Sequence, residues 1–219
     1  RKWYPISDPP QFGILPLILG SLFVTMGATI IAVPIGVASA VYIAEMASPR
    51  IKEILKSGIE ILAAIPSVVL GFIGITTLVP FLKNFMNLPT GLTAFAGSIM
   101  LAFMAMPTIV SIAEDSLTAV PQKYKEAALA LGATRWQTIV RVIIPYSMSG
   151  ITAGAILGVG RAIGETMAVL MVTGNAAVIP HSILEPVRTI PATIAAELGE
   201  APQGGLHYES LFLLGCILF

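Results

Sequence analysis

The chain has 219 residues, of which 56% are hydrophobic and 11% are charged. Soluble domains carry about 25% charged residues, so this composition excludes an ordinary aqueous domain and points to the lipid bilayer as solvent. Twelve basic and twelve acidic residues cancel, which argues against a nucleic-acid partner. The single Cys216 excludes a disulfide framework within the chain, and His181 and His207 stand too far apart in sequence to suggest a metal site.

Four long apolar stretches follow one another along the chain, at residues 12–44, 58–82, 91–112 and 150–172. Each exceeds the ~18 residues that indicate a transmembrane helix. A further apolar run begins at residue 208 and is shorter than the roughly 20 residues that a span requires. We therefore expect one all-α, polytopic transmembrane domain over residues 1–219, with a partial span at its end, and truncated at both ends.

Basic residues gather in two of the connections between these stretches. Residues 45–57 hold three of them and residues 114–149 hold four, whereas the other two connections hold only Lys83 and Arg188. The positive-inside rule places the two basic connections in the cytoplasm and the segment 173–207 outside.

Three of the apolar stretches contain a proline, namely Pro34, Pro66 and Pro107. A proline removes one helical hydrogen bond and is expected to kink its helix. Ser67 and Thr108 directly follow two of these prolines and have hydroxyl groups that can satisfy the freed carbonyls. Two interpretations stay open: kinks that serve packing, or broken helices that line the path of a solute.

The basic segment 114–149 is too long for a simple turn and predicts two short helices at the cytoplasmic face. Pro121 suits the start of the first helix, and Gly132 suits its end. Thr134 is well placed to cap the second helix.

A motif in this segment resembles the EAA loop of type I ABC-importer permeases. Its residues, with the family's spacing, are Glu126, Ala127, Ala128, Gly132, Val142, Ile144 and Pro145. The family usually has isoleucine at the position of Val142 and leucine at the position of Ile144, and this chain keeps branched apolar side chains at both. In that family the first short helix docks into a cleft of the ATPase subunit. The resemblance implies that Glu126, Ala127, Ala128 and Gly132 form this coupling element; an interfacial helix without a partner is the alternative.

The chain lacks the glycine-rich loop with lysine that cradles the phosphates of ATP. We therefore expect no cofactor and no enzymatic activity in this chain, with ATP and Mg²⁺ bound by a separate ATPase subunit.

Arg161 and Glu165 interrupt the fourth apolar stretch, four residues apart and hence on one face of a continuous helix. A charged residue at the bilayer centre costs ~2.5–3.5 kcal/mol or more, so the pair should face the bundle interior or a wet cavity. Either the two form a structural salt bridge, or Arg161 attracts an anion that Glu165 helps to release. A guanidinium suits tetrahedral oxyanions because it donates two parallel hydrogen bonds. The glycines at 150, 154 and 158 predict close contact with another helix.

The run 160–169 is similar to the hallmark stretch of phosphate-specific transport permeases, and runs 65–69 and 106–110 resemble their other span motifs. The run 185–189 is similar to their C-type subunit, and the resemblance covers essentially the whole chain. It implies inward phosphate transport by alternating access, with an A-type permease subunit, an ATPase dimer and an external phosphate-binding protein, in a bacterial or archaeal cell membrane. The candidate substrate-pathway residues are Arg161, Glu165, Ser67 and Thr108.

Two alternatives remain at this point. One is a permease for another oxyanion, such as molybdate, sulfate or phosphonate. The other is an ion-coupled carrier or channel that needs no ATPase.

Overall fold

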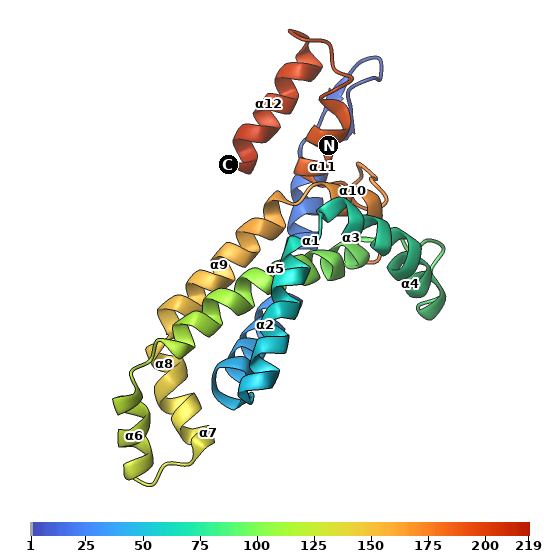
Figure 1. Ribbon diagram of the computed structural model, residues 1–219. Coiled ribbons are helices and arrows are strands. Elements are labelled where there is room, and N and C mark those ends of the chain that lie inside the picture. The colour runs from blue at the N-terminus through green and yellow to red at the C-terminus, as the bar shows by residue number, and fades with distance from the viewer. Residues whose placement is uncertain (1) are drawn as a thin grey trace. The chain divides into compact units, whose positions relative to one another are not determined.

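The computed structural model describes residues 2–219 and is mainly helical (Figure 1). An antiparallel hairpin of two short strands, β1 (Trp3–Tyr4) and β2 (Gln11–Phe12), comes first. The helices that follow, with η for a π-helical turn, are α1 (Leu15–Val41), η1 (Tyr42–Met46), α2 (Pro49–Ala64), α3 (Ser67–Ile73), η2 (Gly74–Leu78), α4 (Val79–Phe85), α5 (Ala94–Thr118), α6 (Gln122–Ala130), α7 (Arg135–Thr138), η3 (Ile139–Ile143), α8 (Ile144–Tyr146), α9 (Met148–Gly164), α10 (Met167–Val172), α11 (Ile190–Glu197) and α12 (Leu206–Leu218).

The chain forms two compact units, each built from separate stretches of sequence. The first, called the terminal unit here, contains the described residues up to Ile31 together with Ile65–Phe103 and Arg161–Phe219. The second, called the loop unit, contains Ala32–Ala64 and Met104–Gly160. Helices α1, α5 and α9 contribute residues to both units.

Three helices in the described chain are long and apolar enough to cross a membrane: Leu15–Met46, Ser67–Phe85 and Ala94–Thr118. The pair Arg135–Tyr146 and Met148–Gly164 is bent by 69° and makes a fourth candidate if it is counted as one span. These helices overlap the four predicted stretches, and α12 covers the predicted partial span from residue 208.

Two predicted spans contain breaks that their hydropathy did not reveal. The stretch 58–82 is divided at Pro66, which has an extended backbone with φ −59° and ψ 138° and precedes α3. Instead of the expected kink, the chain leaves the helix altogether, because proline lacks an N–H and disfavours the helical conformation in the residue before it. The stretch 150–172 is divided between Gly164, the last residue of α9, and Met167, the first of α10.

The loop unit is held together by an apolar core and by close helix packing. Its buried residues are Ala40, Val41, Ile43, Val110, Ala113, Leu117, Val120, Ile139, Ile143 and Ile151. A Cβ atom at Gly150 would overlap Ser116, and one at Gly158 would overlap Ile109, so the glycine-rich face of α9 lies directly against α5. This confirms the close contact that the spacing of the glycines predicted.

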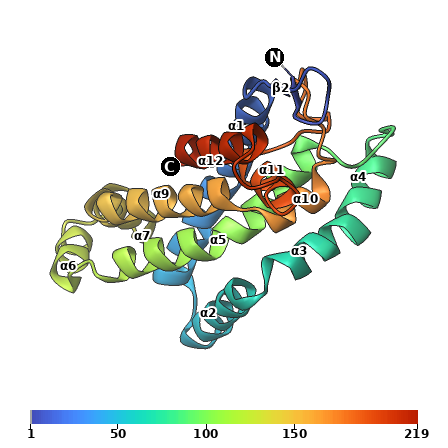
Figure 2. The same cartoon turned by 90° about the horizontal axis from the view of Figure 1, so that it is seen from above.

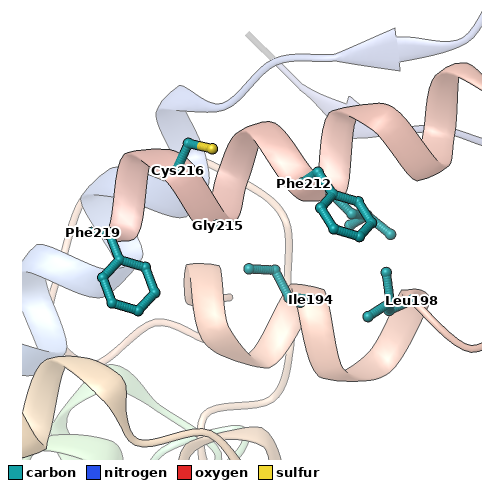
Figure 3. A pocket seen from close by; sticks show the side chains of 7 residues that line it. Ile194, Leu198, Phe212, Gly215, Cys216 and Phe219 are labelled. Atoms are coloured by element: carbon teal, nitrogen blue, oxygen red, sulfur yellow. The ribbon is translucent and has the colours of Figure 1, made fainter.

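The terminal unit has a separate core, in which the N-terminal hairpin packs with the last two helices. Its buried residues are Trp3, Leu17, Ala177, Ile190, Ala201, Leu211 and Leu214. Helices α11 and α12 lie side by side (Figure 2). An apolar groove of about 480 Å³ runs between them, where Ile194 of α11 and Leu198, directly after that helix, face Phe212 of α12 (Figure 3).

Candidate functional site

The predicted coupling segment forms two short helices, α6 and α7, joined by a tight turn (Figure 1). Gly132 has φ +83°, and the N–H groups of Gly132 and Ala133 donate to the carbonyls of Leu129 and Ala128. This Schellman pattern ends α6 where glycine costs no Cβ strain. The Thr134 hydroxyl accepts a hydrogen bond from Gln137 N, and the Gln137 side chain accepts one from Thr134 N. The expected roles of Gly132 and Thr134 in ending and starting the two helices are thus confirmed.

Helix α6 carries Glu126, Ala127 and Ala128 and buries no residue of its own. Two large apolar side chains close to it are also uncovered: Leu131 is 90% exposed and Trp136 is 62% exposed. Exposed apolar surface of this kind marks a place where a protein or a membrane is contacted. The segment therefore has the form of a docking element.

Two side-chain contacts of α6 reach other helices of the loop unit. Lys125 Nζ lies 2.5 Å from Glu45 Oε1 of η1. The rings of Tyr124 and Tyr146, the latter in α8, have centroids 5.4 Å apart. The helix is thus linked to the end of the long helix that starts at Leu15, and to the bend before α9.

A buried carboxylate, which sequence reasoning missed, joins α2 to α5 in the same unit. Glu114 is 1% exposed, and its two oxygens lie 2.7 Å from Lys52 Nζ and 2.6 Å from Lys56 Nζ. The Thr118 hydroxyl donates to it at 3.0 Å. The hydrogen bond to Glu114 raises the pKa of Lys56 above its ordinary value. The sequence did contain a signal for this cluster. Lys52 and Lys56 are spaced one helical turn apart, and Glu114 stands at the end of an apolar stretch.

Three of the four candidate pathway residues belong to the terminal unit. Arg161 lies in the last turn of α9 and is exposed, whereas Glu165 follows the end of that helix. The expectation that the two share one continuous helical face is therefore wrong, because α9 ends at Gly164. Glu165 instead turns toward α10, where its Oε1 lies 3.5 Å from Ala168 N. Thr108, on α5, belongs to the loop unit, so the structure does not group it with the others.

Ser67 and Glu165 are brought to the same end of a tightly packed helix pair. A Cβ atom at Gly71 of α3 would lie 3.0 Å from Ala168 Cα of α10, and one at Gly74 would lie 2.8 Å from Val172. The contacts advance in the same direction along both helices, so α3 and the α10 segment run parallel. Ser67 begins α3, and Glu165 stands just before α10. The backbone breaks in the two predicted spans thus lie together.

The two prolines that do lie inside helices share one groove of the loop unit. Pro34 of α1 and Pro107 of α5 line a space of about 700 Å³ together with apolar side chains of α2. Ser39 and Tyr42 provide the hydroxyl groups in its lining. The lining of the groove contains no charged side chain that could attract an anion. The hinge role of the two prolines stays a prediction.

A second carboxylate that the sequence did not reveal, partly buried with its side chain 14% exposed, binds several residues of the terminal unit. Glu197 of α11 lies 2.5 Å from Arg188 Nη1, 2.9 Å from Trp3 Nε1 and 2.9 Å from His207 Nε2. His207 lies in the first turn of α12 and has a carboxylate partner. Phe12 packs against both ring systems, with centroids 5.8 Å from Trp3 and 6.5 Å from His207.

Comparison with known proteins places this architecture among transport proteins. The model of the family described as "Binding-protein-dependent transport system inner membrane component" matches residues 32–196. A probable ABC transporter permease protein, YqgH of Bacillus subtilis, is 41% identical over 99% of this chain and 70% of its own length. The phosphate transport system permease protein PstC of Mesorhizobium japonicum is 38% identical over 100% of this chain and 72% of its own.

Solved structures agree on the fold. An inward-facing structure of the MetNI methionine ABC transporter superposes with a TM-score of 0.73, at 20% sequence identity, over 97% of this chain and 93% of that one. The resemblance to ABC-importer permeases is thereby confirmed, with the all-α fold of the type I class. The chain belongs to the family of binding-protein-dependent transport system inner membrane components.

Proposed function

We propose that this chain is a permease subunit of an ATP-driven importer that moves inorganic phosphate inward across a bacterial or archaeal cell membrane, which it crosses several times. The proposal rests on one observation above the others. Proteins named as phosphate permeases are 36% to 38% identical to this chain over its whole length, so the similarity is not confined to the coupling segment.

The complex would contain a second, A-type permease subunit, a dimer of ATPase subunits and an external phosphate-binding protein. ATP and Mg²⁺ would be bound by the ATPase dimer, and this chain would need no cofactor. Helix α6, with Glu126, Ala127 and Ala128, would seat in the ATPase. Small alanine side chains allow a helix to approach a groove closely, and the exposed face of α6 is available for such a contact.

Transport would proceed by alternating access. The binding protein delivers phosphate to the outer face, and closure of the ATPase dimer then moves α6 and reorients the spans. Pro34, Pro66 and Pro107 would act as hinges during this step. Arg161 would donate hydrogen bonds to the anion, and Glu165 would compete with it, so that attraction remains weak enough for release. Ser67 and Thr108 would offer hydroxyl groups along the path.

The test is the uptake of radiolabelled phosphate by the assembled complex carrying Arg161→Gln. Loss of a charged hydrogen-bond donor to the anion costs about 1.5–3 kcal/mol, which corresponds to a roughly tenfold to hundredfold loss of uptake. Arg50→Gln, which removes the same charge from an exposed position of α2, is the control and should leave uptake unchanged. Assembly is checked by co-purification of the ATPase subunit.

Three results would contradict the proposal. Normal uptake by Arg161→Gln would remove the anion-contact role. Stronger competition by molybdate, sulfate or phosphonate than by unlabelled phosphate would assign the permease to another oxyanion, and uptake without any ATPase subunit would favour an ion-coupled carrier.

A further inference from the structure

We infer that the ion pair between Lys125 and Glu45 transmits the movement of α6 to the end of the long helix Leu15–Met46, and that these two are positioning residues for coupling. The inference rests on the proposed function, because it assumes that a partner pushes on α6. It adds to that function one specific ion pair that passes the movement on, and this pair is not part of the coupling motif.

Helix α6 lies against α7 and η3 but contributes no residue to an apolar core, so a direct ion pair adds a specific link to its neighbours. No residue of the helix is buried, so core packing does not hold it. Its two ends are turns, with Pro121 in an extended conformation before it and Gly132 in the left-handed region after it. A short rigid helix between two turns pivots when pushed, unless a side chain braces it.

Lys125 supplies this brace. Its side chain is 18% exposed and that of Glu45 is 12% exposed, so the pair is largely withdrawn from water. The two residues are 80 positions apart in the sequence, and their contact joins parts of the loop unit that the local backbone does not connect. Partial burial makes the pair stronger and less screened than one on an open surface.

Glu45 in turn belongs to a firmly held element. It lies in η1, where Ile43 is 3% exposed and packs in the core of the loop unit next to Val41. A force on the Glu45 carboxylate therefore acts on a packed helix end. The contact between the rings of Tyr124 and Tyr146 is less suited to passing on the movement of α6. Both rings are about half exposed, and a ring contact is less directional than an ion pair.

A charge swap tests the inference. Lys125→Glu and Glu45→Lys each place two like charges at the contact, and the double variant restores an opposite pair with its order reversed. We expect each single variant to lose phosphate uptake at least tenfold, while the ATPase subunit still co-purifies. The double variant should recover half or more of the wild-type rate. Lys83→Glu, a charge reversal at an exposed position of α4, is the control and should keep normal uptake.

Binding-protein-stimulated ATP hydrolysis is the second readout, and it separates this inference from the proposed function. If the wild-type complex fails to import phosphate yet hydrolyses ATP when stimulated, the choice of substrate is wrong, and the charge-swap pattern in hydrolysis still tests the brace. Single variants with normal uptake and normal stimulation would overturn the inference. So would a double variant no better than the singles, which would mean that Lys125 acts directly on the ATPase.

Discussion

In each of the two compact units a carboxylate is bound by several side chains, and the two arrangements differ. Glu114 of the loop unit is held by two lysines from the same helix, α2, and their side chains are 29% and 42% exposed. Glu197 of the terminal unit is held by Trp3, Arg188 and His207, which come from three separate segments and are each mostly buried.

This difference decides what happens when the carboxylate is removed. The lysines around Glu114 have long flexible stems and can turn into water. The partners of Glu197 cannot do so: Trp3 is 1% exposed, and Arg188 already has a buried Nε without a hydrogen-bond partner among the described residues. We therefore expect Glu197 to be the more costly residue to replace, although Glu114 is the more deeply buried.

The largest effect is expected for Glu197→Leu. Removing one partner of this partly buried pair leaves an uncompensated charge on Arg188 and should destabilise the fold by up to about 3–5 kcal/mol. The measurement is the thermal unfolding midpoint of the purified complex. Glu200→Leu, an exposed glutamate three positions further on, is the matched control. An equal shift of the midpoint in both variants would mean that the contacts of Glu197 with Trp3, Arg188 and His207 do not stabilise the fold.

A smaller effect is expected for Glu114→Gln. The amide oxygen can still accept the hydrogen bond from Thr118, and both lysines can retreat to solvent. The cost should be about 1–3 kcal/mol, measured in the same unfolding assay. The neighbouring Asp115→Asn removes the same charge at an exposed position and should cost nothing measurable. If Glu114→Gln destabilises the fold more than Glu197→Leu, the exposure of the side chains that bind each carboxylate does not determine the loss of stability.

The smallest effect is expected for Lys56→Met, below about 1 kcal/mol, because a pair with so exposed a lysine is largely screened by solvent. Its pH dependence is distinctive. The hydrogen bond to Glu114 raises the pKa of the Lys56 ammonium above its ordinary value of 10.5. The pair therefore contributes its full stability below pH 10.5 and loses it as the pH rises through the higher folded-state pKa. The gap between wild type and variant should be constant around neutral pH and close as the pH rises above 10.5. A gap that stays unchanged through that rise would refute this account.

Much of the architecture could be predicted from local sequence patterns. Apolar stretches revealed the long helices, because the cost of exposing backbone groups to lipid leaves few other structures. Pro121, Gly132 and Thr134 marked where the short helices α6 and α7 begin and end, because each of these residues has a conformational preference that acts within a few positions. The glycines at 150, 154 and 158 indicated a contact face for the same reason.

The candidate site was less predictable, since its features depend on residues far apart in the chain. Hydropathy averages over a window, so it could not reveal that the helix stops at Gly164 and separates Arg161 from Glu165. Nor could spacing reveal that Lys125 meets Glu45, that Glu114 meets Lys52 and Lys56, or that Glu197 gathers Trp3, Arg188 and His207.

Composition and local patterns were thus enough to predict a membrane-embedded helical protein with two short helices in the segment 114–149, because solvent preference and backbone conformation are properties of short stretches. Which charged groups are paired became visible only in the folded chain. Electrostatic energy depends on distance and burial in space, and folding sets both by joining segments that the sequence keeps apart.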